Sequence, residues 1–200
     1  MAEIDAAPWP LLPHPQAPGE AARQVAARAD LAPPVLLRLR YVLEADPRRV
    51  RIPAPVAGGG RADGLWAHTC FEAFIGLDES PSYLELNFSP SGQWAAYRFE
   101  SYRQGMAPAA LEEPPRLTVR RDGERLELEA EVRLAGALPG TPRSTRSAAA
   151  GNWRARIALS TVVEDQEGGL SYWALRHPPG RPDFHHPDCF SLALEFSRKA

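Results

Sequence analysis

The chain has 200 residues and a formal net charge of −2, with 44% of its residues hydrophobic and 24% charged. A chain of this length can bury a core large enough to stabilise one domain without disulfide bonds, so a single compact domain is expected. The balance of charges lacks the basic excess that holds a phosphate backbone, so nucleic acid is excluded as an expected partner.

The first stretch of the chain is rich in proline. Residues 1–34 hold seven of the 21 prolines, and each proline removes a backbone donor and disfavours helix at the residue before it. We expect an N-terminal arm here, with at most one short helix near residues 20–29, where alanine and arginine are frequent. There is no basic start followed by an apolar run, and no later stretch approaches the roughly 20 apolar residues of a membrane span. A cytoplasmic protein with no membrane partner is therefore expected.

From residue 35 onward, apolar and polar residues alternate with the period of two that is typical of strands with one buried face. Asp122 and Gly123 separate two such runs and form a pair that tolerates a tight hairpin. The pattern predicts eight or nine strands and almost no helix. The strands are expected over residues 35–45, 67–77, 82–89, 93–102, 116–134, 152–163, 170–177 and 189–197. Short strands separated by turns favour two packed antiparallel sheets. We therefore predict an all-β domain over residues 35–200, a two-sheet antiparallel β-sandwich of the jelly-roll or immunoglobulin-like kind.

The segment LWAHTCFEAF places an aromatic ring and a carboxylate on one side of a predicted strand. Trp66 and Glu72 share a parity along the strand, and Trp66 lies at its mouth. A sugar can lay its apolar ring face on an indole while its hydroxyl groups donate to an acid. The structural alternative is that Trp66 caps the core while Glu72 pairs with an arginine.

Two further segments supply polar and aromatic groups. NFSPSGQWAAYRFESYR contains Asn87, Trp94 and Arg98, and amide, indole and guanidinium groups suit a polyhydroxy ligand. ALRHPPGRPDFHHPDCF contains four prolines, which predict an extended loop. Loops of this kind commonly carry binding groups. We expect Arg176 and His185 to contribute from this loop.

Histidine and carboxylate side chains also raise the alternative of a zinc-dependent hydrolase. Adjacent histidines on an extended chain point in opposite directions, so His185 and His186 do not easily share one ion. No GxSxG elbow is present, and no glycine loop ends in the Lys-Ser or Lys-Thr that binds phosphate. We therefore expect no catalytic residue, no metal and no cofactor. The hydrolase alternative would use His68, His185, His186 and Asp188.

Together, the segments LWAHTCFEAFIG, YLELNFSPSGQWAAYRFESYR and RPDFHHPDCFSLALEF resemble the DOMON-like group of β-sandwich domains, in particular the branch found with UDP-N-acetylmuramate dehydrogenases. The resemblance covers residues 35–197 and extends more distantly to carbohydrate-binding module family nine. In the latter family a Trp and a Glu six positions later help to hold the sugar, which implies this role for Trp66 and Glu72. A second aromatic residue closes over the sugar in that family, and Trp173 and Phe184 are the candidates for it here.

The DOMON-like group also contains domains that bind haem and transfer electrons, for which Met and His are typical ligands. Met106 and His177 are residues of that type in this chain. Our main prediction is a non-catalytic module that binds a small carbohydrate or a similar polar ligand. A haem-binding or redox module and a metal-dependent hydrolase stay open as alternatives. The residues expected to line the carbohydrate site are Trp66, Glu72, Asn87, Trp94, Arg98, Arg176 and His185.

Overall fold

The computed structural model describes residues 7–32, 35–78, 80–137 and 153–196. Within these residues nearly all regular structure is β, which confirms the predicted class, and the helical elements are two short 3-10 turns. The strands are β1 (Trp9–Pro13), β2 (Ala22–Ala32), β3 (Leu36–Ala45), β4 (Gly60–Arg61), β5 (Cys70–Leu77), β6 (Tyr83–Phe88), β7 (Gln93–Phe99), β8 (Ala107–Pro108), β9 (Arg116–Asp122), β10 (Arg125–Arg133), β11 (Trp153–Glu164), β12 (Leu170–Ala174) and β13 (Leu192–Phe196). The 3-10 turns are η1 (Leu65–Ala67) and η2 (Pro187–Cys189).

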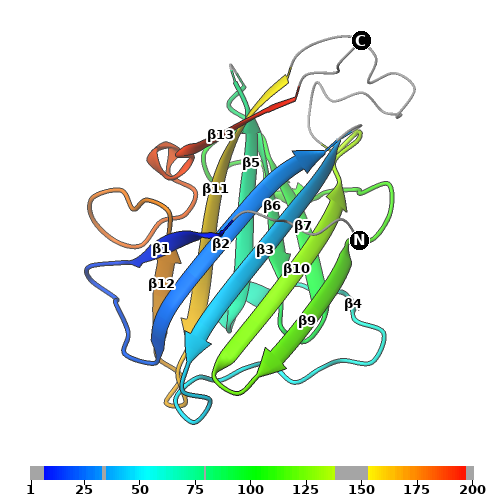
Figure 1. Ribbon diagram of the computed structural model, residues 1–200. Coiled ribbons are helices and arrows are strands. Elements are labelled where there is room, and N and C mark those ends of the chain that lie inside the picture. The colour runs from blue at the N-terminus through cyan, green and yellow to red at the C-terminus, as the bar shows by residue number, and fades with distance from the viewer. Residues whose placement is uncertain (1–6, 33–34, 79, 138–152, 197–200) are drawn as a thin grey trace.

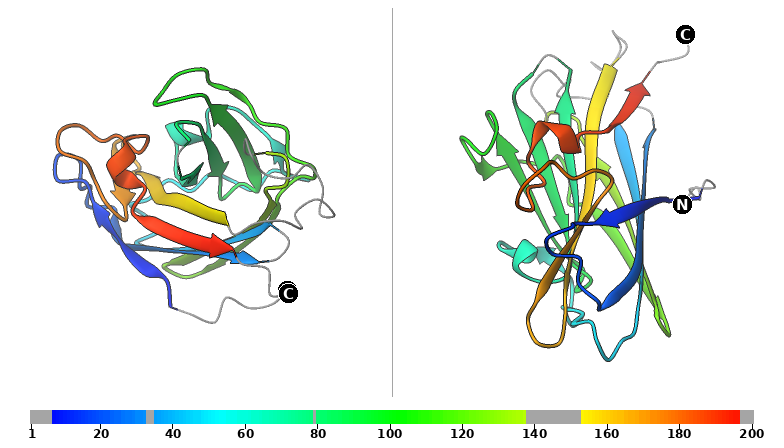
Figure 2. Two further views of the ribbon diagram at one scale, coloured as in Figure 1. Left: turned by 90° about the horizontal axis from the view of Figure 1, so that it is seen from above. Right: turned by 90° about the vertical axis from the view of Figure 1, so that its left-hand side faces the viewer.

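The strands follow one continuous hydrogen-bonded order, β4-β7-β6-β5-β11-β12-β1-β2-β3-β10-β9, with β13 beside β11 and β8 beside β7. This sheet curls on itself, so that β2, β3 and β10 lie opposite β5, β6 and β11 (Figure 1; Figure 2). In place of the two separate sheets that we expected, the two halves are joined through β1. One edge of β1 pairs with β12 and the other pairs with β2.

The N-terminal segment expected as an arm contributes two of these strands. The helix expected near residues 20–29 is wrong, because this stretch belongs to β2, which pairs with β3 over almost its whole length. Val25, Ala27 and Ala29 are each 0% exposed and point into the core. Alanine favours helix in isolation, but here the packing between β1 and β3 overrides that preference.

The main apolar core lies between the two halves of the curled sheet. Tyr41 on β3 and Phe71 on β5 are fully buried there, with their ring centroids 5.1 Å apart. A smaller cluster lies on the other face of β5, β6 and β7, under the loop that leads to β13. Its buried aromatic residues are Phe74, Tyr83, Tyr97, Phe99 and Phe184. Because side chains alternate along a strand, β5 supplies Phe71 to the first cluster and Phe74 to the second.

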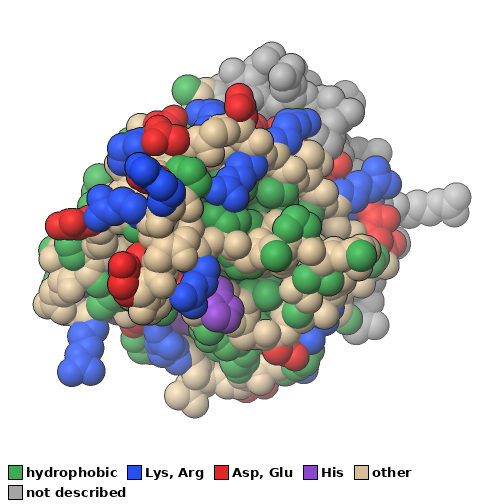
Figure 3. All heavy atoms as spheres, turned by 90° about the horizontal axis from the view of Figure 1, so that it is seen from below, with side chains coloured by type: hydrophobic (Ala, Val, Ile, Leu, Met, Phe, Trp, Pro, Cys, Tyr) green, Lys and Arg blue, Asp and Glu red, His purple; other side chains and the backbone are tan. Residues whose placement is uncertain are grey.

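The predicted hairpin is confirmed, with Arg125 opposite Asp122 and Gly123 in the turn at a φ of 55°. Such a positive φ is easy for glycine, which explains the choice of residue. On the face seen from below, hydrophobic side chains gather among acidic and basic side chains (Figure 3). Among the described residues, no helix has the length and apolar character needed to cross a bilayer.

Candidate functional site

A cavity of about 430 Å³ opens on the face of β5, β6 and β7 that points away from the main core. It brings together three of the predicted site residues, Trp66, Glu72 and His185. They come from η1, from β5 and from the loop before η2, which are far apart in the sequence. The other lining residues are Ala67, Phe74, Glu85, Phe99, Arg103, Met106, Val162, Leu170, Tyr172, Pro182 and Phe184.

Two buried carboxyl groups line this cavity. Glu72 is 3% exposed and Glu85 is 5% exposed. The register of β5 and β6 pairs Glu72 with Asn87 and Phe74 with Glu85, so the two glutamates are diagonal neighbours on one face of the sheet. Ser160 Oγ donates to Glu72 Oε2 at 3.5 Å, while Asn87 Nδ2 donates to Glu85 Oε1 at 2.8 Å.

Burial raises the pKa of both carboxyl groups. For Glu72, loss of water is the main cause, and the negative charge of Glu85 adds to it. For Glu85, burial again dominates, although the hydrogen bond from Asn87 and the charge of Arg103 oppose the rise in pKa. The pair therefore favours holding a proton at pH values where an exposed glutamate has lost it.

The imidazole of His185 lies beside these acids. Tyr83 Oη and His185 Nδ1 are 2.9 Å apart, and the same hydroxyl accepts the backbone N–H of Arg103 at 3.1 Å. On the other side of the ring, Nε2 faces Glu85 Oε2 at 3.8 Å. Burial and the charge of Arg103 lower the pKa of His185 to about 4, so the ring is neutral at physiological pH.

Asp183 fastens two loops around the cavity. Its Oδ1 accepts from Arg103 Nη2 at 2.7 Å and from the backbone N–H of His185 at 3.1 Å, and its Oδ2 accepts from the hydroxyl of Tyr102. Burial opposes ionisation of Asp183, but the hydrogen bonds from Tyr102 and Arg103 outweigh it and lower the pKa. These bonds fix the loop before η2 that carries His185, which we call the histidine loop, relative to the loop after β7.

Exposed apolar side chains surround the mouth of the cavity. Trp66 is 39% exposed, and its ring meets that of Tyr97 edge to face at 5.6 Å. Met106 is 49% exposed and lines the same opening. The hydroxyl of Tyr97 is itself held by Asp63. An exposed indole fixed in this way is suited to stack on a ligand that enters the cavity.

The other four predicted residues do not line this cavity. Asn87 is fully buried and supports Glu85 through its amide. Arg98 and Arg176 are exposed on the surface. Trp94 has the opposite parity from Tyr97 and packs against the main core. The sequence reasoning missed Glu85 and Arg103, although the shared parity of Glu85 and Asn87 on one strand was a usable signal.

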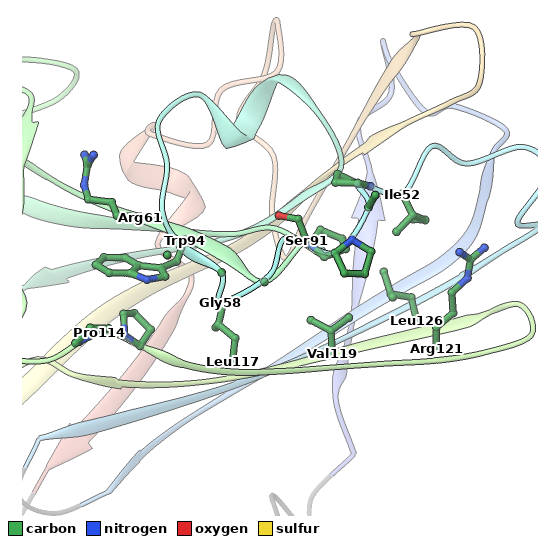
Figure 4. Close-up of a pocket in the computed structure, with 18 residues that line it drawn as sticks. Ile52, Gly58, Arg61, Ser91, Trp94, Pro114, Leu117, Val119, Arg121 and Leu126 are labelled. Carbon is green, nitrogen blue, oxygen red and sulfur yellow. The ribbon is translucent and has the colours of Figure 1, made fainter.

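Trp94 lines a second, larger cavity of about 930 Å³, shown in Figure 4. Leu117, Val119 and Leu126 of the β9–β10 hairpin line it from the other side. Five prolines and several glycines make up much of the remainder, and its charged members are Arg61 and Arg121. Ser91 adds a hydroxyl, but the described residues place no carboxylate, side-chain amide or imidazole in its lining, whereas the smaller cavity combines two carboxyl groups with an imidazole. The smaller cavity is therefore the better carbohydrate site.

The residues of the two alternative functions have separate partners. His68 Nδ1 lies 2.8 Å from Glu164 Oε2, and His186 Nδ1 accepts the backbone N–H of Asp188 at 3.2 Å. Within the described residues, no group of three or more His, Cys, Asp or Glu side chains is arranged to hold a metal ion.

The haem alternative needs a methionine and a histidine that face one another. Met106 lies at the mouth of the smaller cavity, whereas His177 Nε2 lies 2.8 Å from the carbonyl oxygen of Leu12. The ring of His177 packs edge to face on that of His14, at 4.8 Å between centroids. These two potential ligands belong to different surroundings, so the geometry gives no support to a shared haem site.

Replacing Glu72 with glutamine should raise the free energy of unfolding at neutral pH, because the amide never has to be ionised inside the protein. A carboxyl group with a raised pKa keeps its proton after the unfolded chain has lost it, so stability falls as pH rises above the ordinary value of 4.5. His185 has the opposite effect on stability. Because its pKa is lowered to about 4, its contribution to the free energy of unfolding grows as pH rises from about 4 to the ordinary histidine pKa of 6.5. Because wild type and the Glu72→Gln variant share His185, the difference in stability between them isolates the effect of the acid.

Urea unfolding at several pH values between 4.5 and about 8 measures this effect, since the midpoint follows stability when the slope is unchanged. We expect the wild type to lose stability relative to the Glu72→Gln variant as pH rises over this range. Glu167→Gln makes the same chemical change on an exposed turn and should follow the wild type. Equal slopes for wild type and Glu72→Gln would show that the Glu72 carboxyl is not strained by burial.

Comparison with known proteins finds no matching family model and no matching curated protein. Among solved structures, the chain is similar to one described as a candidate carbohydrate-binding protein from Bacteroides uniformis, with a TM-score of 0.63 and 15% identity over 94% of this chain and 85% of that one. It also matches a carbohydrate-binding module of family 9 from Caldicellulosiruptor kristjanssonii, solved in complex with glucose, with a TM-score of 0.42 and 11% identity over 78% and 69% of the two chains. The first likeness shows a shared fold. The resemblance to the DOMON-like group stays a prediction.

Proposed function

We propose that this protein is a binding module for a small carbohydrate, and that the sugar occupies the cavity between Trp66 and the Glu72–Glu85 pair. The observation that carries the proposal is the convergence of an exposed indole, two carboxyl groups and a neutral imidazole on one opening. The indole offers a surface for the apolar face of a pyranose, and the polar groups offer partners for its hydroxyls. The cavity volume of about 430 Å³ falls within the usual range for small-ligand sites, about 300–1,000 Å³.

Each polar group has a distinct part in this proposal. A carboxyl group that holds a proton both donates and accepts, and an ionised one accepts, so the Glu72–Glu85 pair can serve either lone pairs or protons of sugar hydroxyls. His185 presents its Nε2 atom beside Glu85, and the amide of Asn87 orients Glu85 by donating to it. Phe184 lines the cavity from the histidine loop and takes the role of the second aromatic residue. The fold shared with a candidate carbohydrate-binding protein agrees with this reading.

We favour binding without catalysis. Glycoside hydrolysis uses two carboxyl groups whose environments separate their pKa values, so that one is a proton donor while the other is ionised. Here burial raises the pKa of both Glu72 and Glu85, and the charge of Arg103 only opposes the rise at Glu85. Two carboxyl groups whose pKa values are both raised are suited to hydrogen bonding with a ligand. They are not suited to hydrolysis, in which one group donates a proton while the other is ionised.

Calorimetric titration of the full chain with a panel of monosaccharides and disaccharides tests the proposal. We expect saturable binding of at least one sugar, accompanied by a change in tryptophan fluorescence because Trp66 lies at the cavity mouth. The same proteins incubated with chromogenic glycosides should release no dye. If no sugar in the panel or on a glycan array binds, the proposed function is wrong.

A further inference from the structure

The acidic side chains that line the candidate cavity are only partly balanced by basic ones. Two carboxyl groups line it, and both are at least nine-tenths buried. Among the described residues, Glu72 has no ion pair, and its side-chain hydrogen bond is the long one from Ser160 at 3.5 Å. The Glu72 carboxyl thus reaches the cavity wall with most of its hydrogen-bonding capacity unused.

The nearby basic groups do not neutralise this pair. The guanidinium of Arg103 is bound to Asp183 at 2.7 Å, and it is half exposed. His185 Nε2 is 3.8 Å from Glu85 Oε2, which is longer than a hydrogen bond, and its ring is neutral at physiological pH. Among the residues that the structure describes, the cavity therefore lacks a positive charge that matches its two acids.

A buried pair of acids without a cation is costly to ionise. In the empty protein a retained proton relieves the cost. A ligand that carries an ammonium group into the cavity would relieve it equally well, and would gain charge-assisted hydrogen bonds to the carboxylates.

We infer that the preferred ligand is an amino sugar with a free amine, whose ammonium group lies against Glu72 and Glu85 while its ring stacks on Trp66. This inference rests on the carbohydrate site proposed above and names the class of sugar that the site selects. Acetylation of the amine removes the charge and lengthens the group, so N-acetylated sugars bind more weakly. Neutral parent sugars keep the stacking but leave the acids unpaired.

Calorimetric titrations compare glucosamine, galactosamine and mannosamine with their parent sugars and their N-acetyl forms. The proposal does not specify the configuration of the sugar, so each amino sugar is compared only with its own parent sugar and its own N-acetyl form. We expect at least one free amino sugar to bind about tenfold tighter than its parent, as a charge-assisted hydrogen bond in a buried site provides. Glu72→Gln and Glu85→Gln should each bring this ratio close to one, whereas the exposed Glu167→Gln should leave it unchanged.

The outcomes separate the two proposals. Parent sugars that bind as tightly as amino sugars would overturn the amine preference and leave the carbohydrate site standing. Absence of binding by every sugar would remove both. Cyclohexylamine that binds as tightly as the best amino sugar would show that the site recognises an amine and not a sugar. The comparison on the wild-type protein decides the matter even where a glutamine variant does not fold.

Discussion

Replacing Phe71 with alanine should lower the free energy of unfolding by about 3–5 kcal/mol, the usual cost of removing a fully buried aromatic ring. Phe71 is 0% exposed on the inner face of β5, where it packs against Tyr41 of β3 at 5.1 Å between ring centroids. These two strands belong to opposite halves of the curled sheet. The variant therefore removes a contact that holds the two halves together, and chemical denaturation followed by circular dichroism measures the loss.

Two other substitutions calibrate this result. Phe71→Leu keeps most of the apolar volume and should cost clearly less than alanine. Trp66→Ala removes a larger ring from an exposed position, so we expect its effect on stability to stay within about 1 kcal/mol. A Phe71→Ala variant as stable as the Trp66→Ala variant would contradict a core shared by both halves of the sheet.

The same packing places the candidate site. Phe71 and Glu72 are consecutive on β5, so one points into the main core while the other points into the cavity. From β3 in the opposite half, the hydroxyl of Tyr41 donates to the backbone carbonyl of Glu72 at 2.7 Å. The position of the acid therefore depends on the closure of the sheet, although no residue of β3 lines the cavity.

Alternation of apolar and polar residues predicted most of the strands, because each of them buries one face against a core. It did not predict β2, whose alanines and arginines favour helix on their own. It also did not predict β1, a short strand that contains two prolines and runs between β12 and β2. Since β1 joins the halves of the sheet, a prediction that placed its residues in an arm could not include this connection.

The candidate site was predictable only in part for a related reason. The predicted strand parity of Trp66 and Glu72 is not the reason they meet, because Trp66 lies in the η1 turn before β5, whereas a proline-rich loop does display His185. Glu85 lies next to Glu72 only because of the register between β5 and β6, which no single strand reveals. The choice between the parity of Trp94 and that of Tyr97 depended on which face of β7 meets the main core, a property of the whole fold.

Replacing Trp66 with alanine should weaken binding of the tightest sugar in the panel about 30-fold, equivalent to about 2 kcal/mol, as expected for a central aromatic contact. The indole is 39% exposed in the free protein, so it is available to stack on a ligand at the mouth of the cavity. Its loss removes the apolar surface that the sugar ring would shield from water in the complex. Calorimetry gives the change in affinity, and circular dichroism checks that the variant is folded.

Trp94 provides the matched comparison, because it is the other tryptophan of the predicted site and lines the larger cavity instead. We expect Trp94→Phe to keep sugar affinity within about twofold, since it only trims a residue that packs against the main core. Trp66→Phe should retain part of the stacking and fall between wild type and Trp66→Ala. The reverse order, with affinity lost at Trp94 and kept at Trp66, would move the carbohydrate site to the cavity beside the β9–β10 hairpin, and the buried acids would then need a different explanation.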